Sequence, residues 1–577
     1  MATYLEQARR FAAGDWLGRD PYHPYHLWQK RAAPPEQWLR WYGEKSFHQA
    51  PLYSYAIAVA MRITSDPVPL IRVVQVLLGA ATCVLLVLLG RAACGPGAGL
   101  VAGLIGAVYG PLFYLELQVL REGPAVFGFL LIAWLTIHSA RHAALPPGPD
   151  LIQARARGVV ASAAAVGGLI GGYALFYETA PILLLGAVVA VGAAARKISW
   201  RRAAGATAAV VVGALLGFAP MLARNAAVGA PLFGASSRPG INLAFCNMAD
   251  AYDSGVTFSP PGEPFRRIMD ASGGSTLGVV REVWRSYEGR RARLLRNWWN
   301  RFTAVWIRNE LPDNTSYDFF RRHSVLLRAS PTFGWVFPAG AAMMAALAVN
   351  SIARSRSTRR PPPRPGRRAA ESRAGSPGSG LHPGAAGRNE YERAEESIAA
   401  AARRVLLVYT GLLAAALTVV PPQARYRLFL VPCFALYAAM LIAAVPGWLR
   451  ARRWGRMGGV AAACAAFALA QHFVSRQRLR ADVRPADWVV AGADWMRTGD
   501  DAQAVAYFRR ALELAPKNAS VRRAMAECLA RLGRIEEAVS NYERVLKDQP
   551  NMPGAQRALE ALRRRPRGPA TRAVGEG

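Results

Sequence analysis

The chain has 577 residues, is 52% hydrophobic and carries a formal net charge of +34. Its arginines cluster in gaps between apolar stretches, so membrane topology explains the charge and a nucleic-acid partner is set aside. The six cysteines show no CxxC spacing, which argues against a disulfide framework or a zinc site.

Residues 1–69 form a polar segment ahead of the first apolar stretch. Its first ten residues, Met1 to Arg10, lack the apolar core of a signal peptide. We expect an outer amphipathic region here, with helices in the headgroup layer, because amphipathic aromatic residues favour that layer. These residues are Trp28, Trp38, Trp41, Tyr42, Tyr53 and Tyr55.

Ten apolar stretches follow, and about 20 such residues are enough to cross about 30 Å of hydrocarbon as a helix. They lie at about 70–92, 97–115, 124–140, 158–176, 180–195, 203–223, 332–351, 402–420, 426–447 and 457–474. The predicted fold class is therefore all-α, a polytopic transmembrane helical bundle. Its membrane core has a first part at 70–223, a helix at 332–351 and a second part at 402–475.

The arginine-rich gaps predict the orientation, because positively charged loops stay in the cytoplasm. These gaps are 91–95, 141–157, 196–202, 352–401 and 448–456, and the segments left outside are 1–69, 116–123, 177–179, 224–331, 421–425 and all residues after about 475. An outer amino-terminal segment needs a helix to carry it across. We therefore expect Met1 to be an internal methionine of a longer protein whose first transmembrane helix lies upstream.

The cytoplasmic gap 352–401 is predicted to be a disordered basic linker, because residues 354–392 consist mainly of Arg, Pro, Gly, Ser and Ala. A plain tether is one interpretation. A docking arm for anionic lipid or a partner is the other.

After about residue 485 the pattern changes to soluble amphipathic helices with a 34-residue repeat that aligns Pro516 with Pro550. Small residues mark helix crossings, and an aromatic residue and a proline recur: Trp488, Gly492, Gly499, Ala504, Phe508, Ala511 and Pro516, then Ala526, Gly533, Ala538, Tyr542, Val545 and Pro550. Residues 485–565 thus resemble a C-terminal α-solenoid of two tetratricopeptide repeats with a capping helix at 555–564. Such repeats bind proteins or peptides, and a folded spacer is the alternative. Because two repeats are marginal alone, we expect them to rest on the membrane domain or on another chain.

Ionisable residues concentrate on the predicted outer face. Glu116 and Glu122 lie within two helical turns, and Glu122 precedes Pro124 where a helix amino terminus keeps a carboxylate ionised. Arg425 and Arg427 occupy a tight outer turn, where a phosphate is the natural partner of a guanidinium group. The alternative is that these charged residues have no catalytic or binding role and only mark the membrane interface, where such residues are common.

Other outer segments supply a predicted substrate region. His48 and Tyr53 lie in Phe47-His-Gln-Ala-Pro-Leu-Tyr53, Asn242 in Gly240-Ile-Asn242, and Glu310 after Asn309. Arg224 ends a span in Pro220-Met-Leu-Ala-Arg224-Asn225.

Taken in order, these motifs resemble the GT-C class of polytopic glycosyltransferases, which includes protein O-mannosyltransferases and the lipid A aminoarabinose transferase. The motifs are Pro51-Leu-Tyr53, Glu122-Gly-Pro124, the Arg224-Asn225 helix end, Gly240-Ile-Asn242 and Ala424-Arg-Tyr-Arg427. The resemblance covers about residues 1–475 and rests on the ordered set. Enzymes of this class transfer a sugar, with inversion, from a polyprenyl-phosphate carrier to a hydroxyl or phosphate group of a protein, lipid or glycan.

The resemblance implies roles for single residues. Glu122 matches the acid of the second outer loop, with Glu116 as a second candidate. Arg425 and Arg427 match the late arginines that hold the carrier phosphate, and Arg224, which matches the Arg-Asn outer helix end, is a further candidate for binding that phosphate. The first catalytic Asp of the family would fall just upstream of Met1. Catalysis would then be a single inverting displacement, in which a carboxylate takes the acceptor proton and cations stabilise the leaving phosphate.

The predicted topology and the resemblance together imply a setting and partners. The protein would lie in the cell inner membrane with its tetratricopeptide domain on the periplasmic side. Its partners would be a polyprenyl-phosphate sugar, membrane lipid and a protein partner or acceptor, with no nucleic acid. No cofactor is certain, and a divalent cation stays open. Two rival classes are a non-catalytic membrane scaffold that displays the repeats, and a transporter built on glycine-rich spans such as Ala164–Gly172.

Overall fold

The computed structural model describes residues 2–30, 32–144, 152–250, 262–312, 315–358, 383–420, 423–478 and 485–564. Every regular element in these ranges is a helix, so the described part of the chain is all-α, as predicted. The chain divides into two compact units. The first unit holds Met1–Glu310 and Ser330–Arg478, and the second holds Leu311–Ala329 and Leu479–Gly577.

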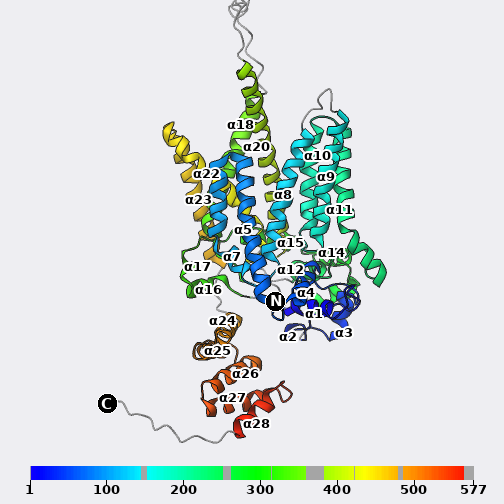
Figure 1. Ribbon diagram of the computed structural model, residues 1–577, viewed down its shortest axis with the longest axis vertical. Helices are drawn as coiled ribbons and strands as arrows, with labels where there is room; N and C mark the ends of the chain where they lie inside the picture. The colour runs from blue at the N-terminus through cyan, green and yellow to red at the C-terminus, as the bar shows by residue number, and fades with distance from the viewer. Residues whose placement is uncertain are drawn as a thin grey trace, which may run out of the picture. The chain divides into compact units, whose positions relative to one another are not determined.

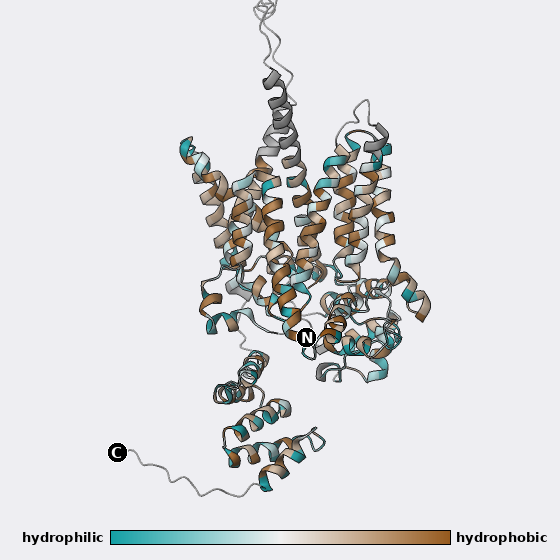
Figure 2. Cartoon of the chain, viewed as in Figure 1, coloured by the Kyte–Doolittle hydropathy of each residue, from teal (hydrophilic) through white to brown (hydrophobic). Residues whose placement is uncertain are grey.

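Long helices form the bundle of the first unit (Figure 1), and their shafts are mostly hydrophobic (Figure 2). They are α5 (Pro67–Cys94), α6 (Pro96–Val108), α8 (Glu122–Ala144), α9 (Ile152–Ala174), α10 (Ala180–Arg196), α11 (Trp200–Val228), α18 (Phe333–Thr358), α20 (Pro383–Ala416), α22 (Leu430–Arg450) and α23 (Trp454–Arg478). Seven helices in the described ranges are long and apolar enough to cross a membrane. Helix thus reaches into both ends of the predicted linker, and residues 359–382 lie outside the described ranges.

The span predicted at 97–115 is bent. Helix α6 and the short α7 (Gly110–Glu116) meet at an angle of 56°, and counting the pair as one span raises the number of candidates in the described ranges to eight. The break falls at Tyr109, just before Gly110 and Pro111. Proline lacks a backbone N–H group and disfavours helical geometry in the residue before it, which accounts for the break.

The arginine-rich ends of the helices meet at one end of the bundle. Arg202, at the start of α11, donates to the His142 carbonyl oxygen at the end of α8 (3.0 Å). Arg403 of α20 donates to the Ala93 carbonyl oxygen at the end of α5 (2.8 Å). The chain therefore places the starts of α8, α18 and α22 at the opposite end.

Short helices of the first unit gather at that opposite end (Figure 1). They are α1 (Ala2–Ala12), α2 (Leu27–Lys30), α3 (Pro35–Tyr42), α4 (Leu52–Ile63), α12 (Arg238–Asn247), α13 (Glu263–Ala271), α14 (Thr276–Arg285), α15 (Arg291–Val305) and α21 (Ala424–Arg427). Helices α3, α12, α13, α14 and α15 build a second hydrophobic core, in which Trp38 and Phe265 lie 5.8 Å apart between ring centroids. Helices α1 and α4 pack into the main core of the bundle instead.

Burial in these two cores corrects the expectation for the amino-terminal aromatic residues. Trp38, Trp41, Tyr42 and Tyr53 are at most 4% exposed, so they do not lie in a headgroup layer. Tyr55 is half-buried, and the side chain of Trp28 lies outside the described part of the chain. Aromatic residues that face a protein core and those that face a membrane recur at the same helical spacing. The sequence pattern therefore could not distinguish the two, and the predicted headgroup location was wrong.

The second unit contains two helix pairs and a final helix. These are α24 (Pro485–Thr498) with α25 (Asp501–Leu514), α26 (Ala519–Arg531) with α27 (Ile535–Asp548), and α28 (Ala555–Arg564). The predicted small positions allow close packing, since a Cβ atom at Gly492 would lie 2.7 Å from the Phe508 ring. Phe508 and Tyr542 fill the core between the pairs.

A segment far away in the sequence completes the second unit. Helices α16 (Tyr317–His323) and α17 (Val325–Ala329) belong to it, although they fall inside the outer segment predicted at 224–331. The Ser316 amide donates to the buried Asp487 carboxylate (2.6 Å), and the rings of Phe319 and Trp488 lie 4.9 Å apart. The first repeat is therefore covered by residues that precede α18.

Candidate functional site

A buried carboxylate and a buried guanidinium group meet at the end of the bundle opposite the arginine-rich ends. Glu122 opens α8, Arg425 lies in α21, and the Arg425 Nη1 atom is 3.6 Å from the Glu122 Oε1 atom. Their side chains are 1% and 7% exposed. The fold thus brings together two candidate residues from distant parts of the sequence.

A second ion pair lies beside the first, with the Arg121 side chain buried and the Glu178 side chain 22% exposed. The Arg121 Nη2 atom donates to the Glu178 Oε2 atom (2.5 Å), and the guanidinium group lies 4.5 Å from the centre of the Tyr177 ring. Burial alone would raise the pKa of Glu178, but the charge and hydrogen bond of Arg121 outweigh it and lower this pKa. Sequence reasoning gave no role to Glu178, although an acidic residue in a short outer loop is a signal.

Several enclosed polar atoms near these pairs have no hydrogen-bond partner among the described residues. They are the Tyr4 and Tyr177 hydroxyl oxygens, the Glu122 Oε2 atom and the His48 Nδ1 atom. The charges of Arg121, Glu122 and Arg425 all act on Tyr4, so these groups lie close together. Buried polar atoms in proteins are normally paired, so this cluster offers hydrogen bonds to a ligand or to water.

Protonation in the cluster follows from burial. Burial raises the pKa of Tyr4 to about 12, and it also raises the pKa of Tyr177 well above its usual value. Burial lowers the pKa of His48 well below 6.5, and the charge of Arg238 lowers it further. At neutral pH the cluster therefore offers neutral hydroxyl and imidazole groups beside charged arginines.

Arg427, the second predicted phosphate ligand, is engaged inside the protein. Its guanidinium group donates to the carbonyl oxygens of Ile307 and Asn309 and to the Glu310 Oε2 atom, each at 2.7 Å. Arg427 is fully buried. It therefore fixes the chain after α15 against α21, the helix that carries Arg425.

Glu310 joins further elements at this point. Its Oε1 atom accepts hydrogen bonds from the Tyr109 hydroxyl group (3.1 Å) and from the Phe333 amide (3.1 Å). Helices α7, α18 and α21 thus meet around one carboxylate. Glu310 was predicted to lie in a substrate region. In the structure it is buried and bonded to Arg427.

Arg224 holds the amino-terminal loops. It donates to the carbonyl oxygens of Leu17 (2.9 Å), Gly18 and Lys45 (2.7 Å), and it lies 4.1 Å from the centre of the Phe47 ring. These contacts fix the loop that carries His48.

The remaining predicted residues lie around the cluster. The Tyr53 hydroxyl group donates to Gln75 (2.5 Å), whose amide donates to the Glu116 carbonyl oxygen (2.6 Å). The Glu116 carboxylate itself lies against Gly79 of α5, so Glu122 is the acid that meets Arg425.

His48 and Asn242 come from separate elements. The His48 ring packs against Tyr42, with 4.9 Å between centroids, and Asn242 is a half-buried residue of α12. Arg238, at the start of α12, acts electrostatically on both His48 and Tyr4. It is a further cation at this site.

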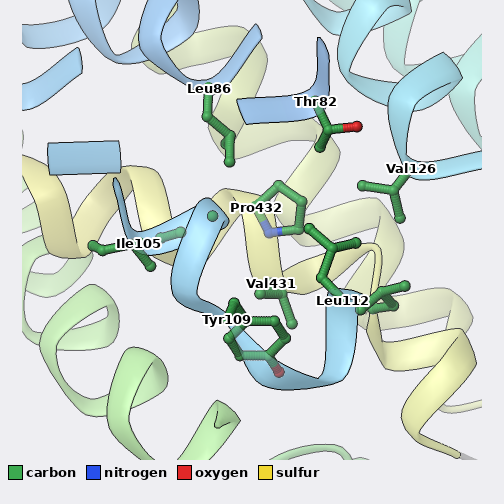
Figure 3. A pocket seen from close by; sticks show the side chains of 11 residues that line it. Thr82, Leu86, Ile105, Tyr109, Leu112, Val126, Val431 and Pro432 are labelled. Carbon is green, nitrogen blue, oxygen red and sulfur yellow. The ribbon is translucent and has the colours of Figure 1, made fainter. Parts of the chain in front are cut away.

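Next to these groups lies a small apolar pocket with an enclosed volume of about 10 Å³, roughly the room that one water molecule needs. Figure 3 shows side chains that line it. Val126 stands one turn after Glu122 in α8, and Leu428 directly follows α21. Other lining residues come from α5, α6 and α22, among them Thr82, Leu86, Ile105, Val431, Pro432 and Ala435. The Thr82 and Tyr109 hydroxyl groups are already bonded, to Leu78 and Glu310, so the lining suits hydrocarbon.

No group of three His, Cys, Asp or Glu side chains within the described ranges is arranged to hold a metal ion. The chemistry that the residues themselves offer is anion binding by arginine and proton transfer by Glu122.

Residues 496–562 match the tetratricopeptide repeat family model. No curated protein shows significant similarity to the chain. The carboxyl-terminal part therefore contains tetratricopeptide repeats, which generally mediate protein–protein interaction.

Proposed function

We propose that this protein is a membrane glycosyltransferase that moves a sugar from a polyprenyl-phosphate donor to a protein, lipid or glycan acceptor. The observation that carries the proposal is the buried contact of Glu122 with Arg425 at 3.6 Å, surrounded by unpaired polar atoms and next to a small apolar pocket. Such a site combines an acid–base group, a phosphate ligand and an adjacent apolar lining. The resemblance of the ordered motifs to those of GT-C enzymes supports the same proposal.

In the proposed reaction an acceptor oxygen attacks the anomeric carbon of the sugar. The bond from this carbon to the phosphate oxygen breaks, and its electron pair leaves with the polyprenyl phosphate. Arg425 neutralises the phosphate, and Glu122, released from Arg425 by the incoming anion, takes the acceptor proton. Because phosphate is a good leaving group, positioning and charge neutralisation supply most of the catalysis.

The neighbouring groups fit the other parts of such a donor. The neutral hydroxyl groups of Tyr4 and Tyr177 can bond sugar hydroxyl groups. The apolar side chains around Val126 and Leu428 offer an apolar surface to the first isoprene units of the carrier. Arg427 and Arg224 act by positioning, because their bonds go to protein groups.

The proposed setting is the outer side of a bacterial cytoplasmic membrane. The arginine-rich ends of α5, α8 and α11 would face the cytoplasm under the positive-inside rule. Glu122 and Arg425 would then face outward, where lipid-linked sugars are used as donors. The tetratricopeptide repeats would also lie outside and bind a protein partner or acceptor there.

The test is a transfer assay with protein expressed from its native locus, purified and supplied with radiolabelled polyprenyl-phosphate sugar and a periplasmic extract. We expect Glu122→Gln and Arg425→Ala to lower transfer at least about 100-fold, the range for a lost acid–base group. Glu263→Gln, an exposed carboxylate in α13, is the matched control and should keep full transfer. Full transfer by Glu122→Gln would refute the proposal.

A second candidate is a membrane-anchored scaffold. It is favoured by the repeats, the segment that matches a known family model. In that case the wild-type protein would transfer no label, and a defined periplasmic partner would be retained by the full chain and lost on disruption of the repeats.

A further inference from the structure

Helix α15 carries an unusual exposed apolar face. Leu295, Trp298, Trp299 and Phe302 follow the i, i+3, i+4, i+7 pattern of one helix face. Each of them is between 39% and 66% exposed. Soluble proteins seldom leave so many large apolar side chains together on one surface.

The opposite face of α15 is firmly packed. The Arg301 guanidinium group donates to the Cys246 carbonyl oxygen, and the Asn297 amide donates to the Tyr287 hydroxyl group (3.0 Å). Leu294 is buried in the second core. The exposed face is therefore held outward by a fixed helix.

The preceding helix repeats the arrangement. Leu277, Val280 and Trp284 of α14 are between 46% and 84% exposed, while Val279 and Val283 between them are buried. Arg281 and Arg285 are also exposed on α14. Two successive helices thus combine exposed apolar residues with arginines.

The apolar face of α15 continues into the bundle. Ring centroids of Trp299 and Phe302 lie 5.7 Å apart, those of Phe302 and Trp306 lie 5.8 Å apart, and Trp306 stacks on Phe337 of α18 at 5.1 Å. Helix α15 also lies beside α20 and α23. Three of these neighbours, α18, α20 and α23, contain candidate membrane spans, so the exposed face joins the surface that meets lipid.

We propose that α14 and α15 rest on the membrane, with their exposed apolar residues inserted among phospholipid headgroups and upper acyl chains. Tryptophan favours this layer because its ring is amphipathic, and arginine can reach the phosphates while its stem lies on apolar surface. The pair performs the surface role that the sequence had suggested for the amino-terminal aromatic residues. The proposal does not depend on the transferase activity.

Photocrosslinking of the full chain in phospholipid nanodiscs tests the proposal. The photoreactive residue p-benzoylphenylalanine replaces Trp299 in one variant and Leu295 in a second, and Arg296 on the rim of the same face is the matched control. After irradiation, mass spectrometry of the digest counts phospholipid adducts. We expect at least about fivefold more acyl-chain adduct at positions 299 and 295 than at 296, because only the apolar face enters the acyl region.

Two outcomes would overturn it. Crosslinks from 299 and 295 mainly to a second copy or to another protein would show that a protein covers this face. Equal adduct at all three positions, or none at 299 and 295, would show that the face does not enter the lipid. Size-exclusion chromatography confirms that each variant is folded and monodisperse before irradiation.

Discussion

Three arginines on one predicted face have different tasks, and their immediate partners decide which. Arg425 faces a carboxylate across 3.6 Å in a cluster that leaves polar atoms unpaired. Arg427 donates to carbonyl oxygens of the chain and to the Glu310 carboxylate, and Arg224 donates to carbonyl oxygens and to the Asn225 side chain. An arginine in apolar surroundings can therefore be available to bind a ligand, or it can hold parts of the chain together. Only its tertiary contacts distinguish these two roles.

Loss of Arg427 should destabilise the fold. Arg427→Gln leaves the Glu310 carboxylate buried, with its charge no longer balanced, which costs about 3–5 kcal/mol. Arg427→Gln combined with Glu310→Gln removes the buried charge and should recover part of that loss. Thermal unfolding in detergent micelles measures both. A double variant no more stable than the single one would show that the ion pair is not the cause.

His48 should make stability depend on pH in the acidic range. Burial and the charges of Arg238, His23 and His26 lower its folded pKa below the unfolded value of about 6.5. The unfolded chain therefore binds more protons below pH 6.5. Stability is fully present above that pH and falls by up to about 1.4 kcal/mol per pH unit as the pH drops towards the folded pKa.

The measurement for His48 is the unfolding temperature between pH 7.5 and 5.5. His48→Gln should flatten the decline on the acidic side, whereas His142→Gln, at an exposed position, should leave it unchanged. An unaltered slope in His48→Gln would contradict the prediction.

At the scale of elements, α9 and α11 pack backbone against backbone. A Cβ atom at Gly167 or Gly171 of α9 would clash with carbonyl oxygens of α11, and one at Gly213 or Gly217 would clash with those of α9. Small residues four apart permit this approach in membrane helices. The glycines that were considered as a sign of a moving transporter helix thus allow α9 and α11 to pack closely.

Two adjacent glycines give a matched test of this contact. Gly171→Ala forces α9 away from the Ala214 carbonyl oxygen and should cost about 1–3 kcal/mol, whereas Gly172→Ala enters open space. Alanine is also a better helix former than glycine, so Gly172→Ala should be neutral or slightly stabilising. Unfolding temperatures in detergent compare the two. Equal effects would show that α9 and α11 do not touch here.

The cover that α16 and α17 give to the repeats is the second feature at this scale. Phe319→Ala removes a buried ring that packs on Trp488, at a cost of about 3 kcal/mol or more. The repeat unit should then be cleaved faster in limited proteolysis of the full chain. Val325→Ala, at a position 74% exposed, is the control and should behave as wild type. Equal cleavage of the two variants would show that this cover is dispensable.

At the scale of the whole molecule, the sequence predicted the features that depend on a periodic pattern along the chain. Hydropathy located the long helices, and a fixed period located the tetratricopeptide repeats. Glu122 and Arg425 were found because charges at helix ends in apolar surroundings need partners. Their pairing is a product of tertiary packing, which local patterns encode only weakly.

What the sequence missed depends on contacts between distant segments. Glu178 and Tyr177 lie in a loop too short to show a motif, and the cover on the repeats comes from residues some 160 positions upstream of α24. Buried and exposed tryptophans have the same helical spacing, so the sequence placed the buried Trp38 in a headgroup layer and gave no role to the exposed Trp299. The two tryptophans differ in burial, and burial depends on which other segments pack against each helix, so neither local sequence reveals it.

The orientation of the whole molecule leads to a final prediction. Cys94 is exposed at the end of α5, next to the arginine-rich ends, while Cys246, Cys433 and Cys528 are buried. Cys83 and Cys464 lie within apolar helices. A water-soluble maleimide should therefore report almost entirely on Cys94 and on the side of the membrane that it faces.

In right-side-out vesicles of a bacterial host, the wild-type protein should stay unlabelled until the membrane is permeabilised, because arginine-rich ends stay inside. Glu288→Cys, in the exposed turn between α14 and α15, should be labelled without permeabilisation. Cys94→Ser confirms the site of wild-type labelling. Labelling of Cys94 from outside would invert the orientation, place Glu122 and Arg425 on the cytoplasmic side and remove the lipid-linked donor from their reach, because the proposed donor is used on the outer leaflet.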